Sequence, residues 1–256
     1  MSIYPQPTKT LMREFVAAEL TPGKVFSKDD AVRWFAQHYP KIKSITVQMH
    51  VNGMSINNRQ RKHHTNIKPG SGHDLFYKLG PNAFRLWDAE KDEPPFYAST
   101  SDVDESADEM SADVESEEFE DREDGPIARE FALESDLRNY ISRNLSVIES
   151  GLRLYEDEGI TGIEFAADGR RIDILCQDRD GHFVVLELKV SRGYDRVMGQ
   201  ILRYMAWVKK NLADDKPVRG MIVASHITSD LKLAASLVPD VSLVEYEISF
   251  QLKRVS

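Results

Sequence analysis

The stretch Gly169-Arg-Arg-Ile-Asp-Ile-Leu-Cys-Gln-Asp-Arg-Asp-Gly-His-Phe-Val-Val-Leu-Glu-Leu-Lys-Val190 decides the fold of the region around it. Residues 171–177 and 183–190 are apolar and β-branched enough for two buried strands. Between them, Arg179-Asp180-Gly181 predicts a three-residue loop with Gly181 in the left-handed conformation. The stretch therefore predicts an antiparallel hairpin.

This hairpin brings three charged side chains together. If Asp178 faces His182, the ladder places Asp173 directly opposite Glu187, about 5 Å away on the same face. Lys189, two residues beyond Glu187, shares that face. The opposite face is wholly apolar and consists of Ile172, Ile174, Cys176, Val184, Leu186 and Leu188.

The paired carboxylates indicate a metal site. Two like charges at this spacing repel each other unless a cation lies between them. Ligation by two carboxylates, a backbone carbonyl and waters suits Mg²⁺ or Mn²⁺. Lys189 would then orient or activate an attacking water, or neutralise charge on a phosphate. The alternative is a structural hairpin with an incidental ion pair, whose charges would be expected at the strand ends in water.

An Asp followed by Glu-x-Lys on the next strand resembles the PD-(D/E)XK nuclease superfamily, and the flanking residues are similar to its NucS (EndoMS) mismatch endonuclease branch. Gln200-Ile-Leu-Arg-Tyr204 matches the Gln-x-x-x-Tyr element of that branch, with both side chains on one helical face. Glu134 lies where the family carries an active-site acid. The superfamily's Pro before the Asp is Ile172 here, which removes no ligand. The resemblance covers about residues 127–250.

The resemblance implies an α/β fold, a restriction-endonuclease-like mixed sheet flanked by helices, and a Mg²⁺- or Mn²⁺-dependent DNA endonuclease. Asp173 and Glu187 would be the metal ligands and Lys189 the catalytic cation. Glu134 would hold a metal-bound water, and Gln200 would orient Lys189 or the substrate phosphate. Other residues expected to contact nucleic acid here are Arg170, Arg171 and Tyr204, although a salt bridge to Asp168 or Asp173 is an equal alternative for the two arginines.

The rest of this half completes the expected sheet. We expect helices over residues 127–145, 194–212 and 230–237, a first strand within 152–165, and later strands over 218–225 and 241–250.

Net charge divides the chain into three parts. The total of −9 splits into +8 for residues 1–87, −15 for 88–124 and −2 for the remainder. The acidic segment has few large apolar residues and cannot bury a core, which predicts a disordered linker over 88–125 between an N-terminal DNA-binding domain and a nuclease domain over 126–256. A solvated spacer and an internal DNA mimic are both open for this segment.

The order of elements in residues 1–87 is typical of a winged helix-turn-helix. We expect three helices, then a hairpin across Gly80-Pro81-Asn82. The second helix starts at Ser27, and Asp30 makes a capping box with it. The helices are expected near 11–20, 27–38 and 44–55, and the strands over 75–79 and 83–87.

A basic cluster follows the third helix. Its predicted nucleic-acid contacts are Asn58, Arg59, Gln60, Arg61 and Lys62, with Arg and Lys on phosphates and the amides on base edges. A solvated basic loop is one alternative, and a metal site of His63, His64 and His73 is another. This half does not resemble the family's own N-terminal region, so mismatch specificity is not carried over.

Composition fits a cytoplasmic protein with no membrane association, because the 256 residues include neither a signal peptide nor an apolar run near twenty residues. The single cysteine, Cys176, is expected to be a core residue. We expect double-stranded DNA as partner, a homodimer, and a role in restriction or defence. DNA repair, or a non-catalytic nucleic-acid-binding regulator with a nuclease-like fold, are the alternatives.

Overall fold

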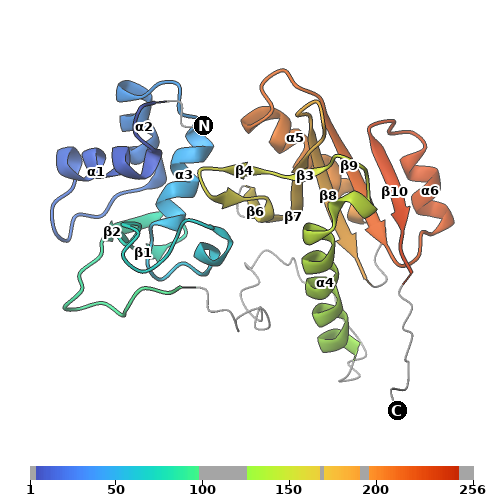
Figure 1. Ribbon diagram of the computed structural model, residues 1–256, viewed down its shortest axis with the longest axis horizontal. Helices are drawn as coiled ribbons and strands as arrows, with labels where there is room; N and C mark the ends of the chain where they lie inside the picture. Colours follow the sequence, from blue (N-terminus) through green and yellow to red (C-terminus); the bar gives the residue numbers. More distant parts are fainter. Residues whose placement is uncertain (1–3, 98–125, 168–169, 191–195, 248–256) are drawn as a thin grey trace, which may run out of the picture. The chain divides into compact units, whose positions relative to one another are not determined.

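The computed structural model describes residues 4–97, 126–167, 170–190 and 196–247, without the side chains of 126–133. They form two compact units (Figure 1): unit 1 comprises Met1–Asp108 with Tyr155–Gly162, and unit 2 comprises Glu109–Leu154 with Ile163–Ser256. Most of the predicted acidic linker, residues 98–125, lies outside the described residues. No helix within the described ranges is long and apolar enough to cross a membrane.

Unit 2 is an α/β unit built on a mixed sheet, as predicted. The strand order is β10-β9-β8-β7, with both β3 and β6 pairing to the outer side of β7. The pairs β10/β9 and β9/β8 are parallel, whereas β7 is antiparallel to β8, β6 and β3. The strands are β3 (Arg153–Leu154), β6 (Ile163–Ala167), β7 (Arg170–Gln177), β8 (Phe183–Lys189), β9 (Val218–Ala224) and β10 (Val241–Glu245).

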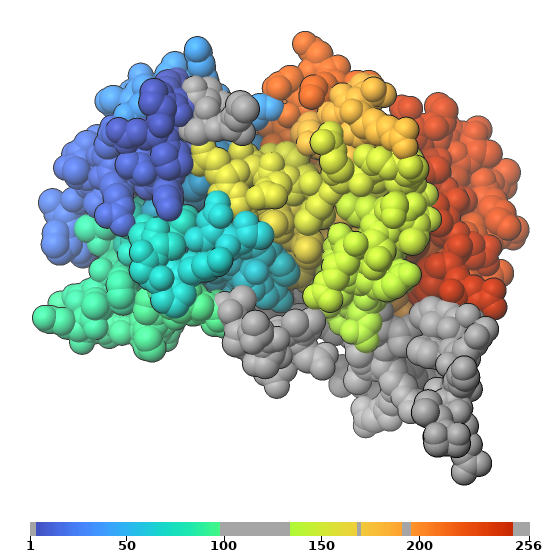
Figure 2. Space-filling model, viewed as in Figure 1, coloured from blue at the N-terminus to red at the C-terminus, as the bar shows by residue number. Residues whose placement is uncertain are grey.

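Helices cover both faces of this sheet. On one face α4 (Pro126–Arg143) packs Leu137 and Ile141 onto the apolar side of the β7–β8 hairpin and onto Met221 of β9. Figure 2 shows the yellow-green residues of this helix on the surface of unit 2. On the other face α5 (Val197–Asn211) approaches β9 so closely that a Cβ on Gly220 would lie 2.7 Å from Ile201. The shorter helices are η2 (Leu145–Val147) and α6 (Ser229–Ala235).

The motif hairpin has the predicted register. Ile174 pairs with Leu186, so Asp173 and Glu187 are the next opposed positions. The turn is also as predicted, because the backbone N–H of Asp178 donates to the carbonyl of His182 over 3.0 Å, and Gly181 has a φ of 76°. The strongest sequence signal therefore predicted the geometry of the strands that carry the charged residues.

Unit 1 contains three helices followed by a hairpin, in the predicted order. Ser27 and Asp30 form the predicted capping box at the start of the second helix. The identification of this arrangement as a winged helix stays a prediction. The elements are α1 (Thr8–Glu19), α2 (Lys28–His38), α3 (Ser44–Gly53), η1 (Arg59–His63), β1 (Phe76–Gly80) and β2 (Ala83–Leu86).

A second hairpin joins unit 1 from a distant part of the chain. It consists of β4 (Glu156–Asp157) and β5 (Ile160–Thr161), within the segment predicted to hold one strand of the nuclease sheet. The prediction is confirmed in that β3 and the start of β6 lie in this segment and join the sheet. Between them, however, the chain leaves β7 at Leu154, packs into unit 1 as the β4–β5 hairpin and returns to β7 as β6. The hairpin is anchored by hydrogen bonds from Thr65 N to Gly159 O and from Thr161 Oγ1 to His63 O, both 2.8 Å long.

Candidate active site of unit 2

Asp173, Glu187 and Lys189 meet on adjacent strands of the central sheet. Lys189 Nζ lies 2.8 Å from Glu187 Oε1. Asp173 Oδ2 accepts a 2.8 Å hydrogen bond from the backbone N–H of Leu188, which ties the side chain on β7 to β8. The predicted group of two carboxylates and one ammonium is therefore assembled.

Glu187 is the least solvated of these groups. Its side chain is 1% exposed, and its Oε2 accepts no hydrogen bond from any residue that the structure describes. Burial and the Asp173 carboxylate raise the pKa of Glu187 to about 8, although Lys189 opposes the shift. Burial also raises the pKa of Asp173, against the Leu188 N–H and the Lys189 charge. The site holds more negative charge than its environment stabilises.

The other predicted site residues lie near the Asp173 and Glu187 carboxylates. Glu134, on α4, has its pKa raised by burial and by the Asp173 carboxylate, so the two carboxylates interact electrostatically. On α5, Gln200 Nε2 lies 3.5 Å from Tyr204 Oη. Burial is the main cause of the raised pKa of Tyr204, and the charges of Glu187 and Asp173 add to it. All five predicted catalytic residues and Tyr204 thus belong to one neighbourhood.

These residues fit a divalent cation. The buried, unpartnered Glu187 Oε2 and the mutual repulsion of Glu187 and Asp173 are what a cation with oxygen ligands relieves. Asp173 and Glu187 would hold the cation, with Glu134 nearby. The carboxylate arrangement carries this inference, and the identity of the ion stays a prediction.

A separate trio of metal-type side chains lies in the turn between β7 and β8. Asp178, Asp180 and His182 place one ligand atom each within 4.8 Å of one another. Asp178 Oδ1, however, already accepts hydrogen bonds from the backbone N–H groups of Asp180 and His182. We interpret this trio as a turn motif.

The alternative of a three-histidine metal site gains no support. The rings of His64 and His73 lie in unit 1 with centroids 5.2 Å apart, but within the described ranges no such histidine group brings its ligand atoms within 4.8 Å. Burial lowers the pKa of His64 to about 3 and that of His73 to about 4, so both are neutral at pH 7.

Two of the predicted nucleic-acid contacts in unit 1 need correction. Arg61 is 2% exposed; its guanidinium pairs with Asp74 and donates to the carbonyl of Ile56, so it stabilises the interior instead of facing a phosphate. Asn58 is 6% exposed and caps the short helix η1 by accepting from the backbone N–H of Gln60. A sequence cluster does not reveal which of its members turn inward.

The remaining predicted contacts lie nearer the surface. Arg59 is exposed, and Gln60 and Lys62 are half-buried. In unit 2, Arg170 and Arg171 are exposed at the start of β7, and Arg171 lies 4.0 Å from Glu164. Their contacts with nucleic acid stay predictions.

The sequence reasoning missed one ion pair at the site. Arg138 on α4 lies one turn beyond Glu134, and its Nη2 is 2.8 Å from Glu164 Oε1 on β6. The signal was available, because Asp168-Gly169 is a common two-residue hairpin turn and counting back from it sets Glu164 opposite Asp173.

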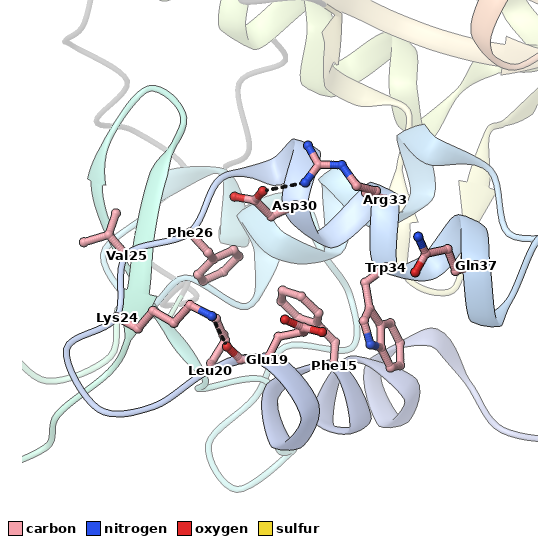
Figure 3. A pocket seen from close by; sticks show the side chains of 10 residues that line it. All are labelled: Phe15, Glu19, Leu20, Lys24, Val25, Phe26, Asp30, Arg33, Trp34 and Gln37. Atoms are coloured by element: carbon pink, nitrogen blue, oxygen red, sulfur yellow. Dashed lines mark hydrogen bonds and ion pairs between the residues drawn. The ribbon is translucent and has the colours of Figure 1, made fainter.

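Unit 1 has a cavity of its own, of about 240 Å³, between α1 and α2 (Figure 3). Three of its four charged side chains are already engaged: Lys24 donates to the backbone carbonyl of Glu19, and Arg33 Nη1 lies 3.1 Å from Asp30, which is part of the capping box. Phe15, Phe26 and Trp34 beneath them pack against one another as core. We therefore assign no ligand to it.

Comparison with known proteins separates the two halves of the chain. Residues 133–247 match the model of the "Endonuclease NucS C-terminal domain". The C-terminal region is NucS-like. Residues 7–86 match a different family, described as "Domain of unknown function (DUF7669)".

Curated relatives match the NucS-like region. An "Endonuclease NucS" of Parafrankia sp. is 32% identical over 111 residues, 43% of this chain and 47% of the relative. The Thermococcus kodakarensis protein of that name is 35% identical over 101 residues, 39% of this chain and 36% of the relative. The chain thus spans less than half the length of these relatives.

Solved structures show a weaker likeness. A "repair endonuclease from Pyrococcus abyssi" is 26% identical, with a TM-score of 0.37 over 52% of this chain and 50% of that one. An "EndoMS-dsDNA2 complex" has the same identity and TM-score over 53% of this chain and 51% of that one.

Proposed function

We propose that the chain is a divalent-cation-dependent DNA endonuclease that hydrolyses phosphodiester bonds with the site on β7 and β8. One observation carries the proposal: Asp173 and Glu187 oppose each other on adjacent strands beside Lys189, and Glu187 Oε2 is buried without a hydrogen bond from any described residue. The names of the curated relatives support the same activity.

Each residue has a separate task in this proposal. Asp173 and Glu187 would hold Mg²⁺ or Mn²⁺, which polarises the phosphoryl oxygen and favours water ionisation. Lys189, kept near Glu187, would stabilise negative charge on the phosphate during displacement. Glu134 would orient the attacking water through a hydrogen bond, and Gln200 would position Lys189 or the phosphate.

Recognition would belong to unit 1. The NucS match begins at residue 133, and residues 7–86 of the basic N-terminal part match another family, so the preference for a given sequence, modification or DNA structure would differ from that of NucS proteins. Restriction or defence is the setting we propose for such a combination, and DNA repair is the second candidate, favoured by the NucS-like half. The Asp, Glu and Lys side chains at the site argue against a non-catalytic regulator.

A plasmid assay tests the activity. Supercoiled plasmid, modified and unmodified, is incubated with the full chain in Mg²⁺, in Mn²⁺ and in excess chelator. We expect nicked or linear product only with a cation and none from Asp173→Asn. Cleavage that persists in chelator would exclude the proposed site, and a wild-type protein inactive on every DNA would favour the regulator.

A further inference from the structure

Three carboxylates follow one another across adjacent strands of unit 2. In the β6–β7 ladder Ile163 pairs with Ile174 and Phe165 with Ile172, so Glu164 lies between them alongside Asp173. The register of β7 and β8 then sets Asp173 opposite Glu187. The row Glu164–Asp173–Glu187 extends the proposed cation site by one strand.

Glu164 is placed there at a conformational cost. Its φ is 46°, in the left-handed region that non-glycine residues rarely adopt. Such backbone strain persists when surrounding contacts hold it, and it is common at functional sites. Here the contact is the 2.8 Å ion pair with Arg138, in which the two side chains are 12% and 10% exposed.

Arg138 reaches the cluster from α4. Its charge acts on both Glu134 and Asp173, where it opposes the effect of burial. Its Nε is buried and donates to no described residue. A desolvated guanidinium with an unused donor is oriented by its Glu164 partner and interacts with Glu134 and Asp173 through its charge.

The formal charges of the side chains around the proposed site would be balanced by one divalent ion. Among the described residues of this cluster, Glu134, Glu164, Asp173 and Glu187 provide four carboxylates, and Arg138 and Lys189 provide two cations. Arg171, half exposed and 4.0 Å from Glu164, is screened by solvent and adds little. With all four carboxyl groups ionised, the excess of two negative charges equals the charge of one Mg²⁺ or Mn²⁺.

We propose that Arg138, fixed by Glu164, is a positioning residue that sets the cation affinity of the carboxylates Glu134, Asp173 and Glu187. Arg138 stands in for part of the missing positive charge before the cation binds, and Glu164 keeps it from closing onto Asp173. This inference rests on the proposed function, because it assumes that Asp173 and Glu187 hold a divalent ion.

Two variants have opposite expected effects. Arg138→Met removes a positive charge and should tighten Mn²⁺ binding about three- to tenfold. Glu164→Gln removes a negative charge and frees Arg138 to compete for Asp173, so it should weaken Mn²⁺ binding by a similar factor. A purely structural ion pair would instead weaken binding in both variants, because each leaves a buried charge unpaired.

The experiment measures free Mn²⁺ by electron paramagnetic resonance during titration of the full chain without DNA. Arg143→Met and Asp136→Asn, exposed positions on the same helix, are the matched controls and should bind like wild type. Thermal melting confirms that each variant is folded, and the conservative Arg138→Lys should keep wild-type affinity.

The results test the inference about Arg138 separately from the proposed function on which it rests. Tighter binding by Arg138→Met together with weaker binding by Glu164→Gln supports it; any other pattern overturns it while wild-type Mn²⁺ binding and cleavage stand. A wild-type protein that binds no Mn²⁺ at millimolar concentration would overturn both the inference and the proposed cation site. If Arg138→Met does not fold, the single variant Arg138→Gln takes its place. Its Mn²⁺ affinity is then compared with that of the single variant Glu164→Gln, with the same opposite shifts expected.

Discussion

Glu187 has a position in unit 2 that suits the proposed cation site but is unfavourable for the stability of the folded protein. Its carboxylate is buried, faces Asp173, and has one oxygen without a hydrogen bond from the described residues. Ionisation of this buried carboxyl group without full compensation destabilises the folded state. The functional claim therefore makes a prediction about stability.

In the absence of cations, stability should fall as pH rises. The pKa of Glu187 is raised to about 8 in the folded protein, above its ordinary value near 4.5. The proton therefore favours the folded state, and that contribution is complete below about pH 4.5 and lost as pH rises through about 8. Thermal melting in chelator should show this decline, and Glu187→Gln should flatten it and raise the melting temperature near pH 8.

The exposed Glu93→Gln is the control for this pH series and should follow wild type. Curves for Glu187→Gln and wild type that run parallel between pH 5 and 8.5 would mean that Glu187 is already compensated in the metal-free protein.

Asp173, Glu187 and Lys189 were predictable because β-strand geometry has a period of two. A three-residue loop with Gly181 set the register, and the register set which side chains share a face. Arg61 was not predictable in this way. Its burial depends on Asp74, thirteen residues later, and nothing local distinguishes it from its exposed neighbour Arg59.

At the scale of elements, the β4–β5 hairpin is the main departure from the predicted layout. The segment has strand-like residues, so periodicity alone favours a strand in the sheet. Contacts with unit 1 decide otherwise: Glu158 Oε2 accepts from the backbone N–H of Thr8 over 2.8 Å and lies 3.4 Å from His50 Nε2. Long-range partners of this kind are invisible to local patterns.

Glu158→Ala should therefore destabilise unit 1. The change leaves the Thr8 N–H and the buried His50 without their carboxylate partner, which costs about 1–3 kcal/mol. Urea unfolding followed by tryptophan fluorescence measures this destabilisation, because two of the three tryptophans, Trp34 and Trp87, lie in unit 1. The exposed Glu156→Ala on the same hairpin should change stability by less than about 0.5 kcal/mol; equal effects of the two changes would show that Glu158 is no anchor.

At the scale of the whole molecule, the positive charge that binds DNA and the residues that cleave it are expected in different parts of the chain. Residues 1–87 carry +8 and the remainder after the acidic segment carries −2. Because non-specific affinity for DNA comes mainly from neutralised phosphates, most of it should come from unit 1.

Replacing Arg59 and Lys62 by Ala in the full chain should weaken duplex binding and lower the salt slope by about 0.9 for each phosphate that is no longer neutralised. Fluorescence anisotropy over a range of salt concentrations measures both the affinity and the slope. Arg61→Ala should instead lower the melting temperature, because it leaves Asp74 unpaired in the interior. An unchanged salt slope of DNA binding in the Arg59/Lys62 double variant would mean that η1 is not part of the DNA-contacting surface.

The most direct test of the whole account is cleavage by Glu187→Gln, with DNA binding measured on the same preparation. The variant keeps the shape of the side chain and removes its charge. We predict that Mg²⁺-dependent cleavage of duplex DNA falls by at least about 1,000-fold while DNA affinity stays within about tenfold of wild type, and that Glu149→Gln, outside the proposed site, cleaves normally. Cation-dependent cleavage retained by Glu187→Gln would contradict the assignment of the active site to β7 and β8.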